Sequence, residues 1–200
     1  MDASPVMSKY IPAIVVGFLV ALLVSAGLAF FFSSAGADAG YLPLMVGAFL
    51  GVFTAYIMAN LAGTKLGKAA TREQKQAVLG FSPEPGHALL IVYREGFVGK
   101  AAGMDLSVDD RFVAQLKSPR FTAISVLPGG HQLWMAFGGL AGKQSKPTVE
   151  GFIAAPGDVI AFRATMQMGM TKNRIVVERI TTDQDLVRRL TPMIMIAPEA

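Results

Sequence analysis

The sequence predicts a membrane α-helical hairpin of two transmembrane helices, followed by an all-β antiparallel sandwich of about eight strands with a short C-terminal helix. Two apolar segments, residues 11–32 and 41–63, contain no charged side chain, and each is long enough to cross a bilayer. From residue 86 onward, short alternating runs separated by turn residues are typical of antiparallel strands. We therefore expect five regions: an N-terminal tail (1–10), the transmembrane hairpin (11–63), a basic juxtamembrane helix with a proline linker (64–85), the sandwich (86–190) and a C-terminal tail (191–200).

The first apolar segment also has some features of a cleavable signal peptide, because Ala35-Gly36-Ala37 resembles a small-residue cleavage site. The apolar run is longer than the core of a signal peptide, however, and a second span follows at once. We therefore favour a retained helix. The connection at 33–40 is short and has no Lys or Arg, so the two spans are predicted to form an antiparallel pair.

Small residues recur at every fourth position in both spans, which places them on one slanted row of each helix. Such rows let helix backbones approach closely in membranes. Each four-residue step drifts by about 40° around a straight helix, so a single partner meets only about three rungs of a row. The remaining rungs are expected to face another copy or a different membrane protein. The predicted helix-packing residues are Gly17, Ala21 and Ser25 in the first span, and Gly47, Gly51 and Ala55 in the second.

The basic residues predict the orientation, since cytoplasmic flanks of membrane spans are enriched in Lys and Arg. Lys9 precedes the first span, and four basic residues follow the second: Lys65, Lys68, Arg72 and Lys75. Both termini are therefore expected in the cytoplasm. Residues 64–79 are predicted to form a helix that extends the second span. Its basic residues form either a patch for anionic lipid headgroups or a solvated stop-transfer flank.

Pro83 and Pro85 end this helix and mark the start of the sandwich. A short helix is expected from residue 182, because acidic residues occupy its first turn and arginines its last turn. Between these points eight runs are predicted to be strands: 87–93, 104–108, 111–116, 121–127, 131–137, 148–154, 159–168 and 174–180.

The turns of this region follow a particular layout. Over residues 104–135, one strand leads through Asp109-Asp110 into the next, and an aromatic strand from Phe121 leads into Pro128-Gly129-Gly130-His131. This layout resembles a bacterial family of small β-sandwich domains of unknown function and is similar to the wider group of PEGA-like sandwiches. The resemblance, over roughly residues 86–190, implies a sandwich in the bacterial envelope and no catalytic residues. Two spans without a lipid-attachment cysteine depart from that family's usual lipid anchor or signal sequence.

Each candidate reactive group has a structural alternative that we favour. His87 and His131 both fall at predicted strand starts, where a turn or strand-edge role outweighs a zinc or catalytic role. Asp105, Asp109 and Asp110 offer oxygen ligands for calcium, but a hairpin turn alone explains the last two.

Five methionines alternate in two short stretches near the C-terminus. Met166, Met168 and Met170 would share one face of a strand, and Met193 and Met195 repeat the spacing in the tail. Thioethers are ligands for Cu(I), but methionine also fills cores and contact surfaces, and core packing is the favoured interpretation.

The charge and composition narrow the function classes. The formal net charge is +4, yet residues 86–200 hold 13 Lys and Arg against 10 Asp and Glu, spread along the chain, so nucleic-acid binding is not expected. The absence of Cys excludes disulfides and thiolate chemistry. No catalytic residue, cofactor or metal site is expected.

The leading hypothesis is therefore a non-enzymatic accessory or scaffolding protein of the bacterial inner membrane, with membrane lipids and itself or other integral membrane proteins as partners. The alternative is an envelope glycan- or protein-binding module with the sandwich on the periplasmic side, where Trp134 would stack on a sugar. An enzyme or a metal carrier is the third hypothesis.

Overall fold

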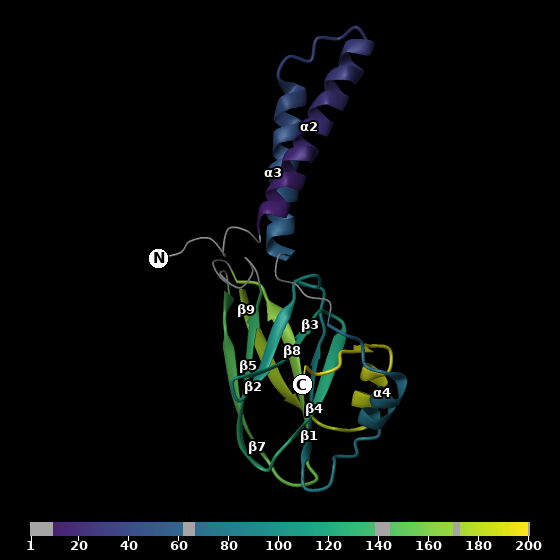
Figure 1. Cartoon of the computed structure of the whole chain (residues 1–200), viewed down its shortest axis with the longest axis vertical. Coiled ribbons are helices and arrows are strands. Elements are labelled where there is room, and N and C mark those ends of the chain that lie inside the picture. The colour runs from purple at the N-terminus through teal and green to yellow at the C-terminus, as the bar shows by residue number, and fades with distance from the viewer. Residues whose placement is uncertain (1–9, 62–66, 139–144, 170–172, 200) are drawn as a thin grey trace. The chain divides into compact units, whose positions relative to one another are not determined.

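The computed structural model describes residues 10–61, 67–138, 145–169 and 173–199. The chain divides into two compact units, Met1–Gly63 and Thr64–Ala200 (Figure 1). The first unit contains two long helices, α2 (Ile11–Ser34) and α3 (Leu42–Leu61). The second contains two β-sheets and two short helices.

Both helices of the first unit are long and apolar enough to cross a membrane. Pro12 lies in the first turn of α2, where its missing N–H breaks no helical hydrogen bond. After Ser34 the chain turns at Gly36, whose φ of 66° lies in the left-handed region that favours glycine. The two apolar helices of the predicted hairpin are therefore confirmed, with bounds close to those expected.

The juxtamembrane segment differs from the prediction. Residues 67–71 are extended, because the Ala70 N–H donates to the Met195 carbonyl at 2.9 Å and the stretch pairs with the C-terminal segment. The prediction of one helix over 64–79 is therefore wrong for residues 67–71. Residues 64–66 lie outside the described part of the chain.

The helix that does form in this segment is α4 (Arg72–Leu79). Its start is fixed by a capping box, in which the Gln74 N–H donates to the Thr71 hydroxyl and the Thr71 N–H donates to the Gln74 side chain. Val78 and Leu79 are partly buried against the outer face of the larger sheet. Packing against the β domain therefore decides where this helix lies.

The β domain is a sandwich of a six-stranded sheet, in the order β10-β4-β1-β8-β9-β6, and a four-stranded sheet, in the order β3-β2-β5-β7 (Figure 1). Its elements are β1 (Ala88–Arg94), β2 (Met104–Val108), β3 (Arg111–Leu116), β4 (Arg120–Val126), β5 (Gly129–Phe137), β6 (Ser145–Lys146), β7 (Thr148–Ala154), β8 (Val159–Gln167), β9 (Asn173–Ile180), α6 (Gln184–Leu190) and β10 (Ile194–Met195).

The sandwich and the C-terminal helix are confirmed, but the larger sheet is mixed rather than wholly antiparallel. β1 pairs with β8 in parallel, and so do β4 with β10 and β6 with β9. A parallel pair needs a long crossover, and the chain between β1 and β8 supplies one by building the smaller sheet. All seven residues of β1 are buried, as expected for a central strand that is covered on both faces.

The larger sheet is covered on both faces because the domain has two hydrophobic cores. The first lies between the sheets and contains Leu90, Leu106, Leu133 and Phe162. The second contains Ile91, Tyr93, Phe121, Leu186 and Leu190, and brings α6 and the C-terminal segment against the outer face of the larger sheet. The C-terminal segment, predicted as a separate tail, is therefore an integral part of the domain.

The methionines do not gather at one point in the described residues. Met193 and Met195 belong to the second core, Met166 packs against the first core, and Met168 is exposed. Met170 lies outside the described residues. The larger sheet lies between Met166 on one side and Met193 and Met195 on the other, and Met168 faces solvent. Core packing therefore accounts for Met166, Met193 and Met195.

Candidate functional site

The small residues of the two spans meet at the contact between α2 and α3. A Cβ added to Gly17 would stand 2.6 Å from both the Gly51 carbonyl oxygen and the Ala55 Cβ. A Cβ added to Gly51 would stand 2.5 Å from the Gly17 carbonyl oxygen and 2.6 Å from the Ala21 Cβ. One added to Gly47 would stand 2.5 Å from the Ala21 carbonyl oxygen and would overlap the Ser25 hydroxyl. The structure therefore brings together all six predicted positions: Gly17, Ala21, Ser25, Gly47, Gly51 and Ala55.

These six residues serve the hairpin itself. At Gly17, Gly47 and Gly51 the backbone of one helix lies directly against the other helix. The expectation that the remaining rungs face another copy or a different membrane protein stays a prediction. The same four-residue spacing continues to Ala13 and Ala29 in α2, of which Ala13 is buried and Ala29 is exposed.

The basic residues predicted to contact lipid headgroups have separate places in the structure. Lys75 donates from Nζ to two backbone carbonyls that follow α6, those of Thr191 and Met193, each at 2.7 Å. Its ammonium therefore fastens the C-terminal segment to α4. Of the other three, Lys65 lies outside the described residues, Lys68 lies in the extended stretch before α4, and Arg72 is the first residue of α4.

A candidate that the sequence patterns did not reveal is the loop between β1 and β2, residues 95–103, which we call the 97 loop. Arg94, the last residue of β1, is fully buried beneath it. The carbonyls that accept hydrogen bonds from the Arg94 guanidinium are those of Leu116 (2.9 Å), Gly99 (2.5 Å) and Ala102. One side chain therefore fixes the 97 loop to the end of β3.

The Arg94 guanidinium contacts backbone carbonyls and the face of an aromatic ring. Its guanidinium lies 5.2 Å from the centre of the Phe137 ring. Burial lowers the pKa of Arg94 to about 10, so the group remains charged at neutral pH. Ser118 holds the loop from the other side, since its hydroxyl donates to the Gly96 carbonyl at 2.7 Å and its N–H donates to the Lys100 carbonyl at 3.4 Å.

The fixed loop displays an apolar side chain to solvent. Phe97 is 88% exposed, and the neighbouring Val98 is 36% exposed. An open hollow of about 610 Å³ lies beside Phe97. Its lining includes three cations and, among the described residues, no carboxylate: Phe97, Lys100, Lys117, Pro119, Arg120 and Ile194. A sequence signal for this site exists in Gly96-Phe97-Val98-Gly99, an apolar pair between two glycines just after an apolar strand.

His131 and Asp109 form an ion pair at the opposite end of the sandwich. The His131 Nδ1 lies 2.5 Å from the Asp109 carboxylate, and its Nε2 lies 2.7 Å from the Leu127 carbonyl oxygen. Both partners are acceptors, so the ring donates from both nitrogens as an imidazolium. The Asp109 carboxylate also accepts from the Gln132 N–H at 2.8 Å. His131 is therefore a structural link between the β2–β3 turn and β5.

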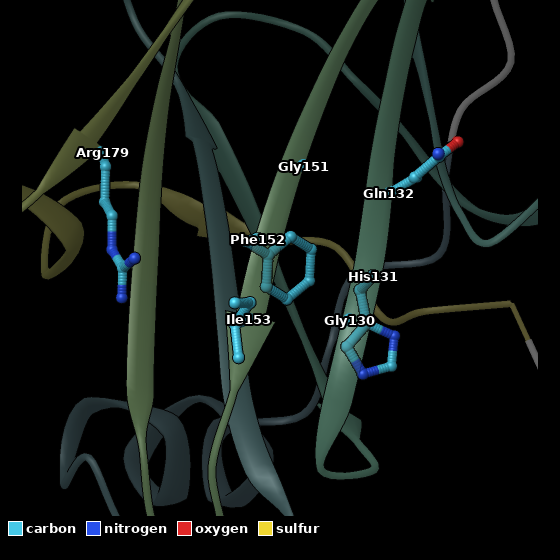
Figure 2. A pocket seen from close by; sticks show the side chains of 7 residues that line it. All are labelled: Gly130, His131, Gln132, Gly151, Phe152, Ile153 and Arg179. Carbon is cyan, nitrogen blue, oxygen red and sulfur yellow. The ribbon is translucent and has the colours of Figure 1, made fainter.

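A shallow hollow of about 580 Å³ lies beside this pair (Figure 2). Figure 2 shows His131 and Phe152 on neighbouring strands and Arg179 on a more distant one. The His131 and Phe152 rings are stacked, with centroids 5.3 Å apart. Since both nitrogens of His131 are engaged, the ring presents no free nitrogen to the hollow.

The ion pair predicts a pH-dependent stability. The hydrogen bond with Asp109 raises the pKa of His131 above its usual 6.5, although burial opposes this. Burial opposes ionisation of Asp109 too, but hydrogen bonds from His131 and the Gln132 N–H lower its pKa. The stabilisation from His131 is complete below pH 6.5 and is lost as the pH rises through the raised pKa. Because Asp109 is half exposed, we expect a loss within about 1 kcal/mol.

Thermal unfolding at pH values on either side of this range checks the prediction. The wild-type protein and a His87→Gln control should both lose stability on the alkaline side, whereas His131→Gln should lack this step. Equal pH dependence in all three proteins would show that the ion pair does not contribute.

The outer face of the smaller sheet carries the aromatic residue considered for sugar stacking. Leu133 and Met135 are fully buried, so Trp134 points away from the core. In register, Trp134 lies opposite Ser107 on one side and Val149 on the other. Ser107 in turn lies opposite Phe112, which completes a row across four strands.

The three aspartates considered for calcium do not converge. Asp105 and Asp109 lie at opposite ends of β2, and the Asp105 carboxylate accepts from the Gln115 side chain at 2.6 Å. Asp109 and Asp110 have φ values of 50° and 64°, as the predicted hairpin turn requires. Within the described residues, no group of three or more His, Asp or Glu side chains is placed to hold a metal ion.

Comparisons with known proteins give limited matches. No family model matches the chain. An uncharacterised protein of Haemophilus influenzae is 34% identical over 65 residues, which cover 32% of this chain and 39% of that protein. A crystal structure of a Bacteroides fragilis protein, provisionally assigned to cell adhesion, matches at 10% identity with a TM-score of 0.26 and covers 50% of this chain and 46% of that one. A TM-score this low does not establish a common fold.

The chain thus spans well under two thirds of both matched proteins. No family is confirmed, and the resemblance to PEGA-like sandwiches remains a hypothesis. What the structure shows is a pair of candidate membrane helices and a β-sandwich domain in one chain.

Proposed function

We propose that this protein is a non-enzymatic accessory or scaffolding protein of the bacterial inner membrane. Its hairpin anchors it with both termini in the cytoplasm, and it assembles with itself or with other membrane proteins. The observation that supports this proposal is the packing of α2 against α3, because helices that meet backbone to backbone suit a permanent two-span anchor. Since the small-residue rows are used within the hairpin, contacts with partners fall to its outward sides, such as Phe18 and Phe49, and to the sandwich.

Two measurements test this proposal. A reporter that is active only in the cytoplasm, fused after Ala200, should be active, and a periplasmic reporter at the same place should be silent. Extraction with a gentle detergent at native abundance should yield a homo-oligomer or a larger complex, whose other members can be identified. Recovery as a monomer alone would contradict the scaffolding role.

A second candidate function is an envelope-binding module with the sandwich on the periplasmic side. It is favoured by the row of Phe112, Trp134 and Val149 on the outer face of the smaller sheet, since flat rows with aromatic side chains can stack on sugars. The reporter fusions separate the two functions: activity of the periplasmic reporter supports this one.

A further inference from the structure

We propose that the 97 loop and its basic neighbours form a docking site for the surface of an anionic phospholipid bilayer. The proposal rests on the proposed function, because it assumes that the hairpin holds the domain at a membrane. It assigns lipid binding to residues other than the basic segment after the second span.

The apolar part of the site is held in place before any lipid arrives. Phe97 is 88% exposed at the tip of a loop that Arg94 and Ser118 fasten through the carbonyls of Gly96, Gly99 and others. Exposing an aromatic ring in water is unfavourable, and a flexible loop would be free to fold it away. A loop fixed with its phenyl ring outward is instead suited to insert that ring at a membrane interface.

The charges around Phe97 complement an anionic surface. Lys100, Lys117 and Arg120 line the same hollow as Phe97, with no carboxylate among its described lining residues. The nearest acidic residue in sequence is Glu95. Its carboxylate forms ion pairs with Arg163 of β8 at 3.1 Å and with Arg189 of α6 at 3.6 Å. Cations close to a membrane surface are attracted to the negative headgroups of the cytoplasmic leaflet.

Within the β domain, the first described residue lies at the same end as the 97 loop. Gly67, the first described residue after the spans, packs against the Ile196 side chain and lies near the carbonyl of Gln115, one residue before the end of β3. The 97 loop lies at this end of the sandwich, where Arg94 bonds to the Leu116 carbonyl.

The form of the site favours a bilayer over a small anion. The hollow beside Phe97 is open, and its cations flank an apolar side chain. A free phosphate needs several donors that converge on one point. A lipid surface instead offers a headgroup to each of several separated cations and an apolar layer to the aromatic ring.

The test uses the full chain in vesicles of anionic phospholipid with brominated acyl chains, which quench tryptophan near the interface. One variant combines Trp134→Phe with Phe97→Trp, so that the only tryptophan lies at the tip of the loop. Its fluorescence should fall by about half or more relative to unbrominated vesicles, since interfacial groups insert ~5–10 Å. Adding Lys100→Glu and Lys117→Glu, or raising the salt concentration, should restore most of the signal.

A matched control combines Trp134→Phe with Leu127→Trp, because Leu127 is 64% exposed in a turn at the opposite end of the sandwich. This tryptophan should keep its fluorescence. A second variant, Phe97→Cys in the otherwise unaltered chain, guards against misfolding of the double variant. A spin label on this cysteine should collide more often with oxygen, which dissolves in the bilayer, than with a water-soluble nickel reagent. Equal fluorescence of the Phe97→Trp variant in brominated and plain vesicles would overturn the proposal.

Alkaline extraction of the same vesicles separates this proposal from the proposed function. If the chain stays in the membrane pellet while the tryptophan at position 97 is not quenched, the docking site is refuted and the anchor stands. If alkali releases the chain, the anchor itself is refuted.

Discussion

Replacing Gly51 with leucine is expected to force the two transmembrane helices apart. Even a methyl group at this position would stand 2.5 Å from the Gly17 carbonyl oxygen and 2.6 Å from the Ala21 Cβ, well inside van der Waals contact. Both obstacles are fixed parts of α2, so no side-chain rotation relieves the clash. We expect Gly51→Leu to destabilise the hairpin by roughly 1–3 kcal/mol or more, as overpacking of a close-packed core does.

The separation of the helices can be measured directly because the chain contains no Cys. Spin labels on cysteines at Leu23 and Val52, each 72% exposed, report the distance between α2 and α3. Gly51→Leu should lengthen or broaden this distance. The matched control is Gly27→Leu, since a Cβ on Gly27 meets nothing within 4 Å, and it should leave the distance unchanged. An unchanged distance in Gly51→Leu would contradict the observed packing.

The hairpin could be predicted from the sequence because its signals are local. A spacing of four residues places Gly47, Gly51 and Ala55 on one side of a helix whatever surrounds it. Which partner that side meets is not a local property. The drift of a straight helix suggested spare rungs for other proteins, and in the structure the six predicted residues all face the other helix of the hairpin.

The strands were predictable for the same reason, since a period of two marks them wherever they pair. Their pairing was not. β1 is buried along its whole length because α4, α6 and the C-terminal segment cover its outer face, and the last two lie far from it in sequence. Likewise, the basic spacing after the second span gave no sign that Lys75 would bind carbonyls near the other end of the chain.

The 97 loop shows most clearly where local reasoning ends. The predicted strand over residues 87–93 stops just before Arg94, and nothing in the local pattern indicates that this arginine is buried. Its burial depends on acceptors from separate segments, the 97 loop and the end of β3. Only the assembled sandwich brings these carbonyls around one guanidinium.

Arg94→Ala is therefore expected to cost at least about 3 kcal/mol of domain stability, because it leaves a cavity and several buried carbonyls without donors. Arg94→Lys should give a smaller loss, since an ammonium keeps the charge but lacks the planar, forked set of donors. Trp134 is the only tryptophan, so its fluorescence follows unfolding of the sandwich in the full chain. Arg111→Ala, at an exposed arginine, should stay within about 0.5 kcal/mol of wild type.

Arg94→Lys also separates the fold of the domain from the state of the loop. If the guanidinium holds the 97 loop, the amides of Lys100 and Ala102, which donate to the Phe97 and Gly99 carbonyls, should exchange hydrogen faster while strand amides stay protected. The same variant should also weaken quenching of a tryptophan at position 97 by brominated lipid. Unchanged loop exchange in Arg94→Lys would mean that Ser118 and the loop's own hydrogen bonds suffice to present Phe97.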